Sequence, residues 1–168
     1  NTFLLIGAMA LTAHWLSGGA PVDLKAKPAV TATTAGLALA LLLVGVSGAI
    51  AALGDTLFPS SSLGEALSAD LSSTSHLLIR LRVIHPVLAL VGAAVLVVAA
   101  MRFPVSPGDH RGRRASTAVA VLAVVQVVAG FVNVLLLAPV WMQMVHLLLA
   151  DALWIAFILL GASALATP

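Results

Sequence analysis

The sequence predicts an all-α membrane protein, in which a four-helix transmembrane bundle follows the tail of a preceding transmembrane helix. Of its 168 residues, 61% are hydrophobic and only 8% are charged, a composition outside the range of soluble globular domains. Four apolar runs reach the roughly 20 residues that a helix needs to cross about 30 Å of hydrocarbon. Most charged residues stand between these runs. The predicted spans are Thr33 to Leu53, Leu77 to Met101, Ala115 to Ala138 and Val140 to Ala166.

A shorter apolar run, TFLLIGAMALTAHWL, fills residues 2–16. It lacks the basic flank and cleavage site of a signal peptide, and about 15 residues are short for a full span. We therefore expect residues 1–17 to be the end of a transmembrane helix from a preceding bundle that this sequence does not contain. Residues 18–32 are then a cytoplasmic loop, and residues 33–166 form the C-terminal bundle.

The charged loops predict the orientation of the bundle. The loop at residues 102–114 holds four arginines and one acid, and residues 18–30 hold two lysines and one acid. By the positive-inside rule, both belong on the cytoplasmic side. The loop after Leu53 has three acids and no Lys or Arg, so we place it outside and the C-terminus in the cytoplasm. Within it, SSLGEALSADLSS fits either a short amphipathic helix on the membrane surface or a solvated loop.

Composition and motifs exclude several kinds of chemistry. The chain has no cysteine, which rules out disulfides, thiolate metal sites and a cysteine nucleophile. It has no glycine-rich phosphate loop, no HExxH metal motif and no serine-nucleophile motif. The pI near 10.0 comes from a few loop cations, a pattern that does not favour nucleic-acid binding. Any chemistry therefore has to come from a bound cofactor.

Two histidines lie inside predicted spans. Counted from the outer boundaries near His76 and Pro139, His85 lies nine residues in and His146 seven, which at 1.5 Å per residue is about 13 and about 10 Å. The second and fourth helices of a bundle face each other across the diagonal, with axes roughly 12 to 14 Å apart. Two imidazoles, with metal bonds of about 2 Å and a flat macrocycle between them, fill that span. The pattern therefore predicts an iron held by both histidines in a bis-histidine haem, although a lone membrane histidine also fits a packing role.

A weak internal repeat supports this pairing. Each outward-running helix ends in a similar pattern, SGAIAALGDTLFP at residues 47–59 and AGFVNVLLLAP at residues 129–139. Each is followed by a helix that carries one of the two histidines. Two helical hairpins related by a pseudo-twofold axis account for this order.

Small residues near the histidines leave room for a flat cofactor. Gly48 shares a helical stripe with Gly45, and Gly92 lies seven residues after His85 on the same stripe. Both glycines are therefore candidate cofactor-contacting residues. Small residues also favour close helix packing without any ligand.

Two arginines stand near His85 at the outer end of its helix. Arg82 lies one turn before His85 on the same face, and Arg80 is close by. An arginine at membrane depth is costly unless paired, and haem propionates at this height are suitable partners. Snorkelling to the interface is the alternative for both. Pro86 removes the amide that would bond to the Arg82 carbonyl, so a local kink is expected to aim His85.

Asp151 is a further ionisable residue within a span. It lies about 140° round its helix from His146, where a contact with Gln126 or Asn133 of the neighbouring helix is possible. Proton relay, quinone contact and interhelical hydrogen bonding all fit it. The remaining histidines are expected to be plain interfacial residues: His14, His76 and His110.

The segments NTFLLIGAMALTA, GAIAALGDTLFPSSSL, LIRLRVIHPVLAL and QVVAGFVNVLLLAPVWMQMVHLLLADALW occur in this order. Together they resemble the second half of a bacterial haem A synthase, over essentially the whole chain. The resemblance implies eight transmembrane helices in two similar bundles and oxidation of the C8 methyl of haem O to the formyl group of haem A. It also implies a haem b in the C-terminal bundle, with ligands that match His85 and His146, and a bacterial plasma membrane location.

The resemblance further implies an oxidoreductase whose partners are the missing N-terminal bundle, haem O bound there and membrane lipid, with quinone or haem O synthase as additional candidates. The family's catalytic residues lie in that other bundle, so those of this chain are unknown and the fragment alone is expected to be inactive. The cysteine pair that some members carry in the outer loop is absent here, which puts thiol-dependent electron delivery in doubt. Two rival hypotheses are a generic membrane b-type cytochrome and a non-haem scaffold or transporter.

Overall fold

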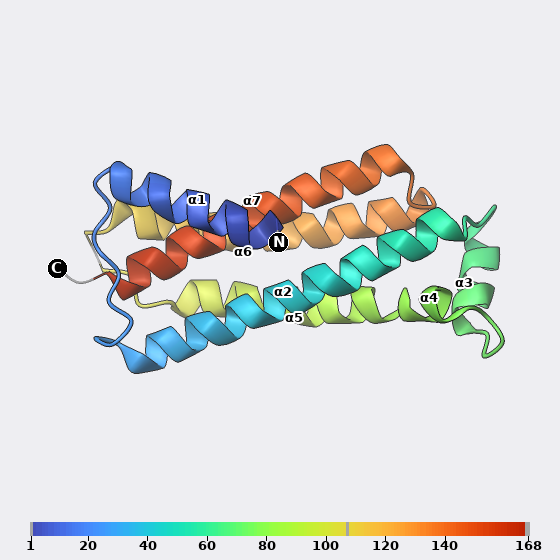
Figure 1. Cartoon of the computed structure of the whole chain (residues 1–168), viewed down its shortest axis with the longest axis horizontal. Coiled ribbons are helices and arrows are strands. Elements are labelled where there is room, and N and C mark those ends of the chain that lie inside the picture. Colours follow the sequence, from blue (N-terminus) through green and yellow to red (C-terminus); the bar gives the residue numbers. More distant parts are fainter. Residues whose placement is uncertain (1, 107, 167–168) are drawn as a thin grey trace.

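The computed structural model describes residues 2–106 and 108–166, and it is built of helices (Figure 1). Four helical spans are long and apolar enough to cross a membrane, which confirms the predicted all-α membrane fold. Three spans are the continuous helices α2 (Pro28–Leu57), α6 (His110–Leu135) and α7 (Val140–Leu165). The fourth consists of α4 (Leu77–Leu81) and α5 (Ile84–Arg102).

The four spans run side by side along the long axis of the molecule (Figure 1). α5 packs against α2 and α6, while α7 packs against α6 and α2. The second and fourth spans therefore occupy opposite corners of the bundle, as the sequence predicts. This places side chains on the inner faces of α5 and α7 opposite each other.

The first helix, α1 (Thr2–Leu16), packs along the outside of α7. The Trp154 indole Nε1 donates a hydrogen bond to the Phe3 carbonyl at 2.6 Å, and the centres of the two side-chain rings lie 5.8 Å apart. Gly7 lets the two helices approach, because a Cβ there would stand 3.0 Å from the Trp154 Nε1. Indole burial and one directed hydrogen bond thus fix α1 against the bundle.

The outer loop contains the short helix α3 (Leu63–Leu71), which packs against α4 beyond the end of the bundle (Figure 1). Its start is a reciprocal cap: the Glu65 amide donates to Ser62 Oγ at 3.2 Å, and the Ser61 amide donates to Glu65 Oε2 at 2.8 Å. These bonds satisfy amide groups that the first helical turn leaves free. Hydrogen bonds from the Ser61 side chain and amide hold the pKa of Glu65 below its usual value. Of the two alternatives for this segment, the structure has the helix.

Four helix ends differ from the predicted spans by three residues or more: the two ends of α2 and the two ends of α6. α2 ends at Leu57, beyond the predicted Leu53. α2 begins at Pro28, whose fixed φ suits a first helical turn, so the last five residues of the predicted loop 18–32 are helical. α6 begins at His110 instead of Ala115, because the Asp109 side chain caps it by accepting from the Gly112 amide at 2.9 Å. It ends at Leu135, since the next turn contains two residues with left-handed backbone: Leu137 (φ 59°) and Ala138 (φ 52°).

The predicted span at residues 77–101 is interrupted at Arg82 and Val83, between α4 and α5. Pro86 explains the break, because its ring nitrogen has no hydrogen to donate to the Arg82 carbonyl four residues earlier. His85 consequently stands in the first turn of α5. The predicted kink is therefore present, and it determines the position of His85 at the start of α5.

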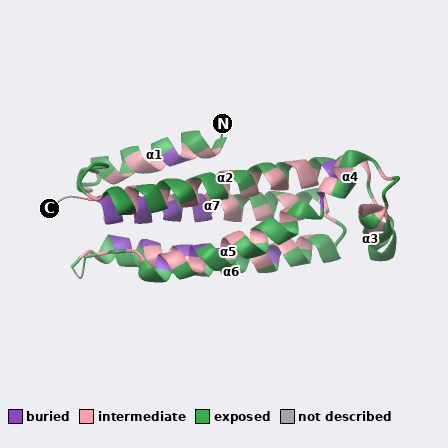
Figure 2. Cartoon of the chain, turned by 90° about the horizontal axis from the view of Figure 1, so that it is seen from below, coloured by how far each residue is buried: buried purple, intermediate pink, exposed green. Residues whose placement is uncertain are grey.

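The hydrophobic core is concentrated at one end of the bundle. Its most deeply buried side chains, Val119, Phe157 and Leu160, come from α6 and α7 in the half that ends near the C-terminus, where Figure 2 shows most of the buried residues. The half that holds His85 and His146 contributes Ala129 and Met142 to the buried hydrophobic residues of the described chain. The histidine half thus buries fewer side chains than the other.

Candidate functional site

The rings of His85 and His146 face each other across the bundle. Their centres lie 6.4 Å apart and their planes are nearly perpendicular, at 87°. A metal bonded to one nitrogen of each ring at about 2 Å, with each nitrogen about 1 Å from its ring centre, requires centres about 6 Å apart. The two imidazoles are therefore separated by the distance that one shared metal ion needs.

A glycine on the neighbouring helix stands against each ring. A Cβ on Gly48 of α2 would lie 3.0 Å from His85 Cε1, and a Cβ on Gly130 of α6 would lie 3.2 Å from His146 Cε1. Gly48 and Gly130 occupy equivalent places in the two repeats, so the pseudo-twofold relation extends to the site. The sequence analysis did not assign Gly130 to the site, although the repeat carried that signal.

The other small residues of the predicted stripes have different neighbours. Gly92 lies against Val44 of α2, where an added Cβ would stand 3.3 Å from Cγ2. Gly45 faces Phe3 of α1, with a separation of 2.7 Å between an added Cβ and the ring. Gly92 thus serves helix packing between α2 and α5, and the Gly45 side of α2 accommodates α1 instead of the histidines.

Ser47 is the hydrogen-bond partner of His85 Nδ1. The Ser47 oxygen lies 3.0 Å from Nδ1, and its hydroxyl is placed to donate to the Val44 carbonyl at 2.7 Å. With its hydrogen on that carbonyl, the Ser47 oxygen can accept from Nδ1–H. In that tautomer the neutral ring carries its lone pair on Nε2, the nitrogen then available to a metal.

His146 has a different surrounding. Its Nε2 lies 3.2 Å from the Gln126 amide nitrogen, which also donates to the His146 carbonyl at 3.1 Å. Its Nδ1 and the Gln126 Oε1 are buried without hydrogen-bond partners. Unsatisfied buried polar atoms are costly, so the site contains groups that a ligand in this space would satisfy.

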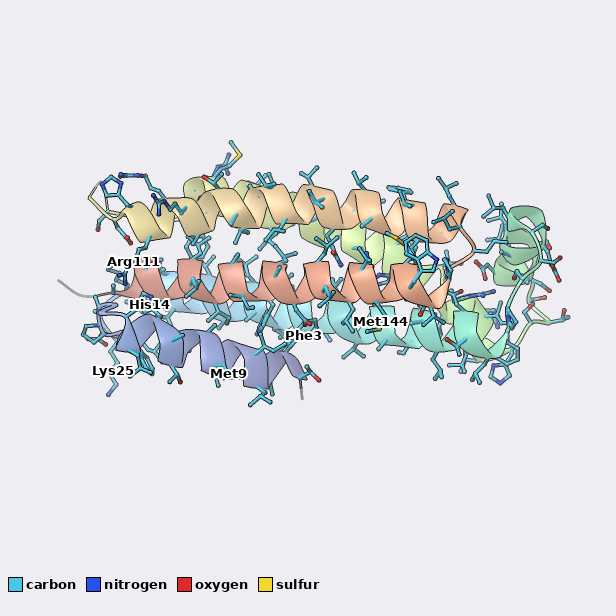
Figure 3. The ribbon with its side chains drawn as sticks, turned by 90° about the horizontal axis from the view of Figure 1, so that it is seen from above. Phe3, Met9, His14, Lys25, Arg111 and Met144 are labelled. Atoms are coloured by element: carbon cyan, nitrogen blue, oxygen red, sulfur yellow. The ribbon has the colours of Figure 1, made fainter. Side chains whose placement is uncertain are left out.

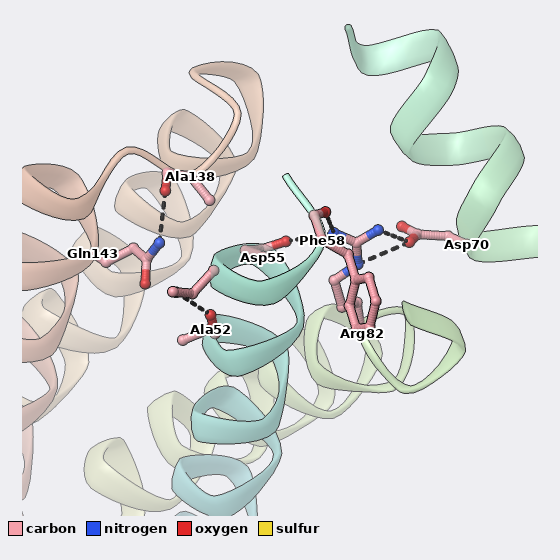
Figure 4. A network of polar contacts seen from close by, with 8 residues as sticks. Ala52, Asp55, Phe58, Asp70, Arg82, Ala138 and Gln143 are labelled. Atoms are coloured by element: carbon pink, nitrogen blue, oxygen red, sulfur yellow. Dashed lines mark hydrogen bonds and ion pairs between the residues drawn. The ribbon is translucent and has the colours of Figure 1, made fainter. Parts of the chain in front are cut away.

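Arg82 lies at the outer rim of the site and has only 8% of its surface exposed. Its guanidinium pairs with Asp55 of α2 at 2.9 Å and Asp70 of α3 at 2.8 Å (Figure 4). It thereby ties α2, α3 and the α4–α5 break together. The partner predicted from the sequence was a propionate; the two carboxylates were not predicted, although both lie in the segment that precedes His85. Arg80 is exposed.

The buried Oδ1 of Asp151 has no hydrogen-bond partner, and neither has Oδ1 of Asn133. Of the three roles that the sequence allows for Asp151, an interhelical hydrogen bond from Oδ1 is not formed. Of the remaining histidines, His76 caps α4 by accepting from the Leu78 amide at 3.2 Å.

The donor set limits which metal group the pair can hold. Among residues 2–106 and 108–166, no group of three or more His, Asp or Glu side chains is arranged to hold a metal ion. Two imidazoles alone leave most coordination positions of a bare ion unfilled, whereas a porphyrin supplies four further nitrogens in a plane. The described residues therefore fit a haem better than a free ion.

Residues 1–158 match the COX15-CtaA family model, described as cytochrome oxidase assembly protein. The chain belongs to this family. Two curated proteins, from two strains of Thermus thermophilus, are each named protoheme IX farnesyltransferase and are 48% identical to it over 167 residues. The matched region covers 98% of this chain but 27% of each relative, so the chain spans about a quarter of their length. No solved structure matches the chain. The family membership confirms the resemblance seen in the sequence and associates the chain with haem assembly for cytochrome oxidase.

Proposed function

We propose that this chain is the haem b-binding bundle of a membrane haem A synthase, in which His85 and His146 would hold the haem iron. The observation that carries the proposal is the 6.4 Å separation of the ring centres across the bundle. Two further observations support it: the histidine half has few buried side chains, and a glycine lies against each ring. A bound haem b supplies one-electron transfer at this position.

The chain's own residues have separate roles in this proposal. Ser47 holds the His85 ring in the Nε2-lone-pair form and fixes its orientation. Gly48 and Gly130 keep the space behind the two rings free of side chains. His146 would exchange its Nε2 contact with Gln126 for the metal, and the Gln126 amide would stay bonded to the His146 carbonyl. The contacts of Ser47 thus preorganise His85, whereas His146 would give up one contact when the cofactor binds.

Arg82 remains our candidate partner for a haem propionate, with Arg80 as the exposed second candidate. The Arg82 guanidinium already holds two carboxylates, so a propionate binds there by replacing one of them. Exchange of Asp70, which belongs to α3, would free that helix from the bundle. Arg82 thus couples the position of the outer helix to the occupancy of the site.

The whole reaction belongs to a longer protein in this proposal. The second bundle would bind haem O and oxidise its methyl group, and the bundle described here would exchange electrons with it from the bacterial plasma membrane, with the C-terminus in the cytoplasm. The relatives from Thermus thermophilus are named for farnesyl transfer to protohaem, the step that produces haem O. We therefore propose that the substrate of the longer protein comes from such an activity. A b-type cytochrome that only carries electrons is the second candidate, because it needs the same histidine pair.

A visible spectrum of the purified, haem-reconstituted chain tests the proposed cofactor. We expect a low-spin haem spectrum, which His85→Ala and His146→Ala each abolish while His14→Ala and His110→Ala leave it unchanged. No Soret band from the wild-type chain, or equal losses from all four variants, would refute the ligand assignment. Haem A formation by the full-length protein then separates the synthase from the simple electron carrier.

A further inference from the structure

A groove of about 640 Å³ lies between α2 and α5, in the half of the bundle opposite the histidines. Its walls are mainly small or branched apolar side chains, among them Ala29 and Leu37 of α2 and Ala94 and Val98 of α5. The small alanines on both helices leave this space unfilled. Its volume is within the range of sites that hold an organic ligand of moderate size.

The groove has the length of a lipid chain segment. Its lining runs over eight residue steps on each helix, from Ala29 to Leu37 and from Ala94 to Arg102, which is about 12 Å at the helical rise. Half of a hydrocarbon core of about 30 Å is about 15 Å. The groove therefore covers most of the depth of one membrane leaflet.

Arg102 stands at the end of this groove, in the last turn of α5. Its side chain is exposed and takes part in no hydrogen bond or ion pair within the described chain. Two other cations at this end of the bundle are engaged: Lys27 donates to the Ala164 carbonyl at 2.8 Å, and Arg111 donates to the Ser17 carbonyl at 3.0 Å. The groove thus ends in an available positive charge.

Among the described residues that line the groove, none is acidic, so none neutralises that charge. The first turn of α2 lies at the same end, and its amide groups at Ala29 and Val30 precede the first possible intrahelical acceptors. The positive end of the helix dipole adds to the Arg102 charge there. A ligand with an apolar chain and an anionic head complements both parts of the groove.

We propose that this groove binds an anionic phospholipid, with one acyl chain between α2 and α5 and its phosphate at Arg102. A neutral quinone would fill the apolar part equally well but would leave the cation without a partner. A zwitterionic lipid carries a phosphate too, but its ammonium group cancels the head-group charge, so its attraction to Arg102 and to the positive end of α2 is weaker. The proposal does not depend on the proposed haem site, because the groove and the histidines lie in opposite halves of the bundle.

Native mass spectrometry of the full chain, with phosphatidylglycerol or phosphatidylcholine of the same acyl composition, tests the proposal. We expect one bound phosphatidylglycerol to be preferred over phosphatidylcholine, and Arg102→Gln to reduce that preference about five-fold, the contribution of one basic residue near an anionic surface. Ala99→Leu should weaken retention of both lipids because it fills the groove. Arg114→Gln removes an equal charge outside the groove and should change little.

Equal retention of the two lipids by the wild-type chain would overturn the proposal. So would equal effects of Arg102→Gln and Arg114→Gln, which would indicate general surface electrostatics. Stronger retention of ubiquinone or farnesyl diphosphate than of phosphatidylglycerol would identify a different occupant. Circular dichroism of each variant checks folding, and a second filling variant, Ala94→Leu, replaces Ala99→Leu if that variant is unfolded.

Discussion

Gly48→Ala is the sharpest test of the histidine site. An added Cβ would lie 3.0 Å from His85 Cε1, 3.3 Å from Nδ1 and 3.4 Å from Nε2, so three ring atoms are affected by one methyl group. Overpacking of this kind costs about 1–3 kcal/mol. The ring relieves it by moving away from Gly48, which displaces the nitrogen that is to bind the metal. We expect haem affinity to fall about 5- to 150-fold, at about 1.4 kcal/mol per factor of ten.

Two other glycines supply matched controls. Gly130→Ala brings a Cβ to 3.2 Å from His146 Cε1 but to 3.9 Å from both ring nitrogens, so its effect should be smaller. Gly36→Ala lies on the same helix as Gly48, with nothing within 4 Å of the added carbon, and should leave affinity unchanged while favouring the helix. Haem titration by Soret absorbance measures all three. An affinity for Gly48→Ala equal to that of Gly36→Ala would refute the reasoning about ring position.

Three further predictions concern the surroundings of the site. Ser47→Ala removes the acceptor for His85 Nδ1–H, so haem affinity should fall about 10-fold or more; an unchanged titration would contradict the assigned tautomer. Arg82→Met leaves Asp55 and Asp70 without their shared cation and should lower the free energy of unfolding by about 2–3 kcal/mol. This is below the roughly 3–5 kcal/mol for a fully buried pair, because both carboxylates are partly exposed. Asp70→Asn should cost less, and the opposite ranking in detergent denaturation would disprove this role of Arg82. The pKa of Glu65 is lowered in the folded protein, so its cap stabilises α3 fully above about pH 4.5. This stabilisation is lost as the pH falls through the folded-state pKa. Hydrogen exchange of the α3 amides should show the loss, and Glu65→Gln should remove the pH dependence.

The sequence could predict the number of spans, the helix in the outer loop as one of two alternatives, and the depth of the two histidines. Each of these depends on local information: the length of an apolar run, the spacing of polar residues and the rise per residue of a helix. The prediction was weaker at helix ends. Asp109 and Pro28 extend α6 and α2 by several residues, because a cap or a fixed φ acts on the first turn whether or not that turn is apolar.

Contacts between helices were harder to predict, as Arg82 shows. Its position one turn before His85 predicts its height along the bundle. Its partners could not be predicted in this way, because Asp55 and Asp70 are 27 and 12 residues away along the chain. Whether Arg82 pairs with a carboxylate of the chain or with one of a ligand depends on how α3 packs against α4, because α3 carries Asp70. Side chains project from all round each helix (Figure 3), so which of them enter the site depends likewise on the rotation of each helix about its own axis.

By itself, the sequence determined that this is a membrane bundle with two histidines at matching heights, because hydrophobic length and helical rise fix where each residue stands along the membrane normal. Only the tertiary structure decided which groups meet at one height. It brought the two ring centres to 6.4 Å, set Ser47 and a glycine against them, and assigned Arg82 to two acids. The physical reason is that helix rotation and crossing follow from packing many side chains at once, and no single stretch of sequence contains that information.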